Sequence, residues 1–594
     1  MTDHLGDHPP VDEISQESGL GVAARPLPRP SVSRGARLTA LSTALAVVLA
    51  GGVVTAAWRA FEPHHAAEEL VPASAFAVGT IDLSLPAGQA DALSAFADRF
   101  PGSPTHHGDG SAVDRLLRAI FRTSSDPHVD YDRDVKPWLG DHAAIAGWMD
   151  HGKPQLEVLL ESTDDGSARR HLTTLMQGDG AVEFADGYAV LGDNDRAVRD
   201  AIAAAHSSSL ADDRTYVGDV DALPGHPAVT GWMDGPAVMR AVKSTLSPGE
   251  ARMFDRMSAA GPFGMLGPLG MTGLAGAGSG AAFGGARAFA GRTAVGIRVD
   301  DRYVELDSRS TGAGDSAGAS TAQLRRLPAT TIAAVELADP GKLVTGVTSM
   351  VGSFLSIPSG PLPEPGLASG GSSTGCVVVP PVRPRAIPRN APHRREILRE
   401  MRLLRRQARQ GHNHPCDFPR PLRLPKPPDP MAQIKDATGL SLPGDATTVL
   451  GDSLLASYGG LGFDGVPKVA LRTHPADLSA AERVMSRVQG KVAAATGLQL
   501  AVEPSGDDLV VATSQDYEHA VEQEGSLADQ ALARLALGSV PDAVASAGYV
   551  DLSKILPLLG SGIPRDVQAL KAIGFWTAAP SGGVQLSQLR VVVG

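Results

Sequence analysis

The chain has 594 residues, a net charge of −12 and only two cysteines, Cys376 and Cys416. This length is sufficient for two or three domains with hydrophobic cores. The acidic balance argues against a general nucleic-acid binder, and two cysteines are too few for a disulfide framework.

The first feature along the chain is an uncharged, apolar run at 38–58. At about 1.5 Å per residue it is long enough to cross a hydrocarbon core about 30 Å thick. Positive charges precede it and negative charges follow it: Arg25, Arg29, Arg34 and Arg37, then Glu62, Glu68 and Glu69. This bias predicts a single transmembrane helix with a cytoplasmic N-terminus and an extracytoplasmic C-terminal region at the cell membrane. Residues 1–37, which are polar and contain prolines, predict a disordered cytoplasmic tail.

The alternative for 38–58 is a cleavable signal peptide. Val54-Thr55-Ala56 resembles a small-residue cleavage site. Against this alternative, the polar region before the run and the apolar run itself are both longer than in ordinary signal peptides.

An internal repeat is the most informative feature of the remaining chain. Leu139-Gly140-Asp141 and Leu450-Gly451-Asp452 each open a strand-like run. The same elements then follow in both copies: a second run at 154–163 and 466–475, a hairpin at 182–191 and 502–511, and a closing pair at 294–309 and 574–593. We therefore predict two α+β repeats, at 66–311 and 324–594, with largely antiparallel sheets that are each covered by helices on one face.

A smaller motif places a proline ten residues before Asp82, Asp234 and Asp551 in three strand-like runs. An acid after a strand and before a helix is typical of a helix cap, because carboxylates are stabilised near the first turn. We interpret these three aspartates as structural.

Two segments interrupt the repeats. Residues 259–291 are rich in Gly and Ala and predict an apolar loop. Residues 357–430 are rich in Arg and Pro, and within them 394–410 has one apolar stripe on a basic helix. That helix would suit an anionic membrane surface or an acidic partner. The alternative, which we favour, is that 357–430 is a lineage-specific insertion or a sequence artefact, and the sequence leaves this choice open.

Two groups of side chains have the composition of metal ligands. Asp130, Asp132, Asp134 and Asp141 match positions 1, 3, 5 and 12 of a calcium loop, but the sixth position holds Val135 instead of glycine. His412, His414 and Cys416 are closely spaced, but a zinc site needs further ligands of fixed geometry. If 357–430 is real and exported, Cys376 and Cys416 are a candidate disulfide. We assign no metal site.

The sequence contains no phosphate-binding loop, dinucleotide fingerprint, HExxH pair or nucleophile elbow. We therefore assign no catalytic residue and no cofactor.

Strand-like runs begin at the tripeptides Val71-Pro72-Ala73 and Leu327-Pro328-Ala329. In these tripeptides and in the run at 134–141, the chain resembles a bacterial envelope family called domain of unknown function 3352. The resemblance covers about 66–594 without 357–430. It implies a membrane-tethered extracytoplasmic protein of the actinobacterial type, and it supplies no catalytic residues.

Two classes of function follow. The first is a non-enzymatic envelope protein, anchored through 38–58, that binds an envelope protein or a small ligand in a cleft between the repeats, or serves as a scaffold. The second is an envelope-modifying hydrolase or transferase in which acids such as Asp141 and Asp452 form a site. The missing catalytic motifs favour the first class.

Overall fold

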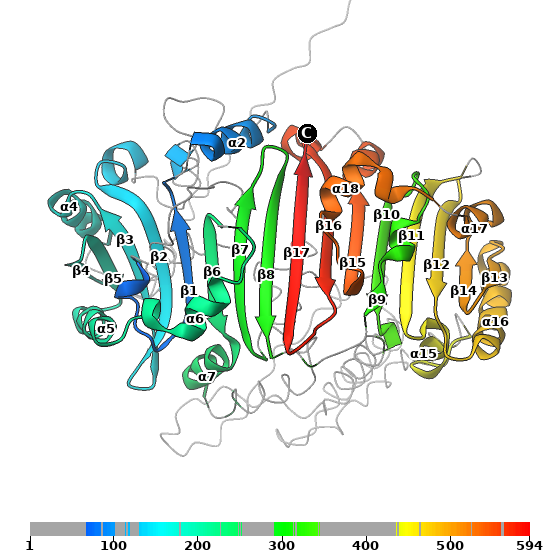
Figure 1. Ribbon diagram of the computed structural model, residues 1–594, viewed down its shortest axis with the longest axis horizontal. Coiled ribbons are helices and arrows are strands. Elements are labelled where there is room, and N and C mark those ends of the chain that lie inside the picture. Colours follow the sequence, from blue (N-terminus) through cyan, green and yellow to red (C-terminus); the bar gives the residue numbers. More distant parts are fainter. Residues whose placement is uncertain are drawn as a thin grey trace, which may run out of the picture.

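The computed structural model describes these residues, with a few isolated ones between them: 67–84, 87–100, 130–176, 180–225, 227–247, 290–312, 318–341, 439–462, 465–523, 525–559 and 563–594. Its strands form one antiparallel sheet of 17 strands (Figure 1). The first half of this sheet contains strands β1 to β8, and the second half contains β10 to β17.

In the first half the spatial order is β4-β5-β3-β2-β1-β6-β7-β8, all antiparallel. The strands are β1 (Ala75–Asp82), β2 (Leu139–Asp150), β3 (Lys153–Ser162), β4 (Ala181–Ala185), β5 (Tyr188–Gly192), β6 (Val229–Asp234), β7 (Arg292–Val299) and β8 (Tyr303–Thr311). The longer helical segments are α2 (Ala87–Ala97), α4 (Asp165–Met176), α5 (Asp195–Ser207), α6 (Arg214–Val220) and α7 (Gly235–Thr245). The short ones are η1 (Glu68–Leu70), η3 (Tyr131–Val135) and η4 (Leu210–Asp212).

In the second half the order is β13-β14-β12-β11-β10-β15-β16-β17. The strands are β10 (Ala333–Ala338), β11 (Ser453–Leu461), β12 (Pro467–Thr473), β13 (Ala501–Ser505), β14 (Asp508–Ala512), β15 (Ala543–Asp551), β16 (Leu570–Ala578) and β17 (Val584–Val593). The short strand β9 (Ala319–Ser320) pairs with the start of β15. The helical segments are α11 (Ala322–Arg325), α15 (Gly444–Leu450), α16 (Leu478–Thr496), α17 (Gln515–Glu522), η8 (Leu527–Asp529), α18 (Ala531–Leu537), α19 (Leu552–Ile555), η9 (Leu556–Leu559) and α20 (Arg565–Gln568).

The two halves have the same order of strands, and they join edge to edge where β8 pairs with β17. The ladder runs from Val584 opposite Thr311 to Val592 opposite Tyr303. In Figure 1 these two strands lie at the centre of the sheet, so the last described strand of the chain is one of its innermost.

The predicted fold class is wrong in two respects. First, the repeats do not form a sheet each, because the exposed backbone groups at the edge of β8 find their hydrogen-bond partners in β17. Second, helices cover both faces: in the first half α5 packs on one face through Val198 and Ala201, and α4 packs on the other through Ala168 and Leu172. In the part of the chain that the structure describes, no helix is long and apolar enough to cross a membrane. The predicted transmembrane run at 38–58 and the predicted tail at 1–37 lie outside the described residues.

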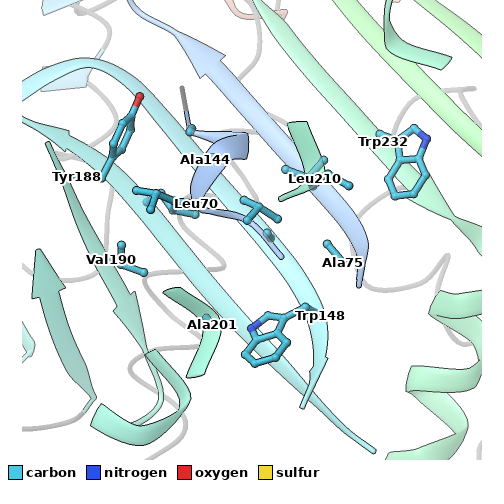
Figure 2. Packing of buried hydrophobic residues seen from close by; sticks show 14 of the residues in the cluster. Leu70, Ala75, Ala144, Trp148, Tyr188, Val190, Ala201, Leu210 and Trp232 are labelled. Carbon is cyan, nitrogen blue, oxygen red and sulfur yellow. The ribbon is translucent and has the colours of Figure 1, made fainter. Parts of the chain in front are cut away.

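The two faces of the sheet follow from strand alternation. In β3, Leu159 faces the core beneath α5, while Val158 faces the core beneath α4. Figure 2 shows the first of these cores, in which Leu70, Val190 and Ala201 pack together. Four tryptophans are buried in the described cores: Trp138, Trp148, Trp232 and Trp576.

The three aspartates predicted to be caps differ in their contacts. Asp234 caps α7 by accepting the backbone N–H of Ala237 at 2.9 Å, as predicted. Asp82 instead accepts from Ser84 in a local turn. Asp551 precedes α19 but accepts from the Ser553 hydroxyl and pairs with Lys554 rather than capping the backbone.

Candidate functional site

A pocket of about 510 Å³ lies at one end of the second half, where β10 ends and β11 begins. Three carboxylates line it, each from a different connection: Asp339 follows β10, Asp452 precedes β11, and Asp477 precedes α16. The rest of the lining is Gly341, Thr447, Thr448, Gly451, Ala476 and Ala480.

Backbone hydrogen bonds hold these connections together. The N–H of Asp339 donates to the carbonyl of Asp452 at 2.8 Å, and the N–H of Asp452 donates to the carbonyl of His474 at 3.0 Å. Gly451 has a φ of 57°, and a Cβ at this position would lie 1.9 Å from the carbonyl oxygen of His474. The glycine of the Leu-Gly-Asp motif is therefore required for the close approach that places Asp452 in the pocket.

The polar side chains of the described pocket lining, three aspartates and two threonines, can accept hydrogen bonds from a ligand. Ionised carboxylates only accept. The hydroxyls of Thr447 and Thr448 donate to the carbonyl of Gly444, at 2.8 and 3.0 Å, and so keep only their lone pairs for other partners. Asp477 also caps α16 by accepting the N–H of Ala480 at 2.9 Å. The three carboxylates of the described lining make this pocket suited to a positively charged donor.

The equivalent residue of the first half, Asp141, lies in different surroundings. Its backbone N–H donates to Oε2 of Glu161 at 2.8 Å. The neighbouring His142 contacts the same oxygen through Nδ1 at 2.8 Å, and its Nε2 lies 3.7 Å from Asp82. The first half therefore has a histidine between two carboxylates where the second half has the pocket.

Asp141 and Asp452 do not share a site. Between β2 and β11 lie β1, β6, β7, β8, β17, β16, β15 and β10. With strands about 4.8 Å apart, the two aspartates are separated by about 40 Å along the sheet. Paired carboxylates of glycoside chemistry lie about 5–9.5 Å apart.

The aspartates that match a calcium loop have other partners. Asp130 caps η3 by accepting the N–H of Arg133. Asp132 accepts two hydrogen bonds from Arg118, at 2.6 and 2.7 Å, and the pKa of Asp132 is lowered by this guanidinium. Asp134 pairs with Arg133, which lowers the pKa of Asp134 to about 2. These carboxylates organise the turn that enters β2, where Nε1 of Trp138 donates to the carbonyl of Asp134 at 2.7 Å.

Several other sequence features lie outside the described residues. They are His412, His414, Cys416, Cys376, the segment 357–430 with its basic stretch 394–410, and residues 259–289 of the Gly-rich segment.

The junction of the two halves contains a buried polar network that sequence reasoning missed. Glu305 and Asp307 of β8 are 2% and 4% exposed, and Arg298 of β7 pairs with both. Arg590 of β17 also pairs with Glu305. Nε2 of Gln588 donates to Asp307 at 3.1 Å, and burial raises the pKa of Asp307 against the effect of Arg298. The alternation of charges along the hairpin at 294–309 was the available signal, but such a pattern is equally typical of a solvent-exposed face.

Comparison of the chain with models of protein families, with curated proteins and with solved structures found no match. The resemblance to domain of unknown function 3352 therefore stays a prediction.

Proposed function

We propose that the protein is a non-enzymatic binding protein whose pocket at Asp339, Asp452 and Asp477 takes a small cationic ligand with ammonium or guanidinium groups. The observation that carries this proposal is the donor–acceptor character of the lining: three carboxylates and two threonine hydroxyls whose own protons are already used. A charge-assisted hydrogen bond contributes about 1.5–3 kcal/mol, so even a small diamine would gain measurable affinity from two such contacts.

We also propose that this binding takes place at the cell envelope. The support is the charge bias on either side of 38–58 in the sequence. Attaching a reporter enzyme that is active only outside the cytoplasm to the C-terminus would test this location.

The hydrolase alternative gains no support from the pair that motivated it, since Asp141 and Asp452 lie in opposite halves of one sheet. Asp452 does lie beside two other carboxylates, those of Asp339 and Asp477. These three acids are sufficient to bind a cation, and no catalytic role is needed to explain them.

The test is calorimetric titration of the full chain with 1,4-diaminobutane, using 1,4-butanediol as the uncharged control. We expect the diamine to bind and the diol not to bind. Asp452→Asn should weaken diamine binding about tenfold to a hundredfold, because it removes one charge-assisted contact. Asp141→Asn, at the equivalent position of the first half, is the matched control and should leave affinity unchanged. Equal binding of diamine and diol, or equal affinity in wild type and Asp452→Asn, would refute the proposal.

A further inference from the structure

The helix α17 buries a carboxylate whose described neighbours include a histidine and a second carboxylate. Glu518 is 1% exposed, and among the described residues no N–H or O–H donates to Oε1 or Oε2 in good hydrogen-bonding geometry. Nδ1 of His519 lies 3.2 Å from Oε2, but outside hydrogen-bonding geometry. His519 pairs with this carboxylate only when the imidazole is protonated. Burying a carboxylate costs several kcal/mol unless it is neutralised, paired with a positive charge or coordinated to a cation.

The first half of the sheet shows which residues this position holds when it has only a packing role. Helices α5 and α17 follow equivalent strands, β5 and β14, and both begin with a side-chain cap, from Asn194 to Ala197 N–H and from Ser514 to Tyr517 N–H. Counting from these caps places Val198 opposite Glu518 and Ile202 opposite Glu522. Val198 is 1% exposed within the core, and Ile202 packs against the same core. At these two positions the second half therefore has carboxylates where the first half has packed apolar side chains.

Two further potential ligands lie beside Glu518. His519 and Glu522 are exposed, and the ligand atoms of Glu518, His519 and Glu522 all lie within 4.8 Å of one another. Burial raises the pKa of Glu518, and the negative charges of Glu522 and Glu503 raise it further, against the effect of His519. A bound cation would remove this repulsion.

We propose that Glu518, His519 and Glu522 bind one divalent transition metal ion of the zinc class. An imidazole with two carboxylates is a donor set that suits Zn²⁺, Mn²⁺ or Fe²⁺, at distances of about 2.0–2.2 Å for zinc. Coordination of a metal ion by Glu518 would supply a permanent positive charge beside this buried carboxylate. Three protein ligands leave a fourth position for water or for a group of a partner molecule.

A second cluster provides an internal control. Asp150, His151 and Asp200 also have ligand atoms within 4.8 Å of one another, but none of these three is buried and His151 is exposed. No buried carboxylate there requires a cation, so we do not assign a site to this cluster.

The experiment is native mass spectrometry of the full chain, first stripped with chelator and then titrated with ZnCl₂. The number of tightly bound zinc ions should be higher by one in the wild type than in Glu518→Gln. The same difference is expected between the wild type and Glu522→Gln. Asp200→Asn should bind the same number as the wild type.

A second variant separates loss of the site from loss of the fold. Glu518→Val introduces the residue that the first half uses, so it should fold, retain the wild-type circular dichroism spectrum and lose one zinc ion. If Glu518→Val and Glu518→Gln both bind as many zinc ions as the wild type, the proposed site does not exist. Because diamine binding by the pocket is measured separately, failure of one proposal leaves the other standing.

Discussion

Arg590 of β17 donates through Nε to a carboxylate oxygen of Glu305 in β8, between residues 285 positions apart in the chain. This contact crosses the ladder between β8 and β17 that joins the two halves. Arg590 also donates to the carbonyl of Leu535 at 3.1 Å, and its guanidinium lies 4.6 Å from the ring centre of Tyr303. Arg590 of the second half therefore pairs with the buried carboxylate of Glu305 and stacks on the ring of Tyr303, both in the first half.

The first prediction concerns this pair. Arg590→Leu should lower the free energy of unfolding by about 3–5 kcal/mol, because it leaves Glu305 buried with one fewer cation. Denaturant unfolding would measure the change. Arg196→Ala, which removes a surface pair with Asp200, is the control and should cost less than about 1 kcal/mol. Similar costs for the two variants would show that the junction network contributes little.

The second prediction concerns the buried carboxyl of Glu157 in β3. Burial raises its pKa from 4.5 to about 8, and neither oxygen has a hydrogen-bond partner. The folded state therefore holds a proton that the unfolded chain releases, so the stability from this group is complete below about pH 4.5 and is lost as the pH rises to about 8. Glu157→Gln should be about 2–4 kcal/mol more stable than wild type at pH 8.5 and similar to it at pH 4.5.

Urea unfolding at several pH values would check this difference. Glu336→Gln should behave in the same way, because burial also raises the pKa of Glu336 to about 8. A Glu157→Gln variant that parallels the wild type at every pH would contradict the prediction.

The third prediction compares two glycines whose substitution by alanine should change the stability of the fold in opposite directions. A Cβ on Gly574 of β16 would lie 2.3 Å from the carbonyl oxygen of Ala536, so Gly574 permits α18 to pack closely on the sheet. Gly574→Ala should therefore destabilise the fold by about 1–3 kcal/mol. Gly490 lies within α16 with nothing near its Cβ position, so Gly490→Ala should stabilise by about 0.5–1 kcal/mol. Thermal unfolding would show the two shifts, and shifts of the same sign would argue against this packing.

The fourth prediction concerns the cap of α7. Asp234→Ala should cost about 1 kcal/mol, because the N–H of Ala237 loses its acceptor. Asp234→Asn keeps an acceptor in the same place and should stay within a few tenths of a kcal/mol of the wild type. Chemical unfolding of both variants would distinguish capping from a purely electrostatic role, in which Asn would be as damaging as Ala.

Local pattern was sufficient to predict many of the strands. The hairpin at 182–191 forms as β4 and β5, and the turn between them is Asp186-Gly187, at which both residues have positive φ. Alternation and turn chemistry are properties of a few neighbouring residues, so the sequence contains them directly. The pairing of β8 with β17 is not local, and nothing in either strand alone distinguishes an exposed edge from a joined one.

The candidate site was predictable only in part. Leu450-Gly451-Asp452 identified one carboxylate of the pocket and the glycine that positions it. No local motif marks Asp339 or Asp477. Only the tertiary structure brings the connections that contain them beside Asp452. Charged residues such as Glu305 and Glu518 were equally inaccessible to sequence reasoning, since a charge in a strand or helix ordinarily faces water.

The central position of β17 has a consequence for biosynthesis. Ribosomes release the first half, with β8 as its open edge, well before β17 has been made. During that interval Glu305 and Asp307 lack the partners that Arg590 and Gln588 later provide, and these charges on an unpaired edge disfavour its association with other nascent chains. The residues that join the two halves of the finished sheet therefore also protect the growing polypeptide from aggregation.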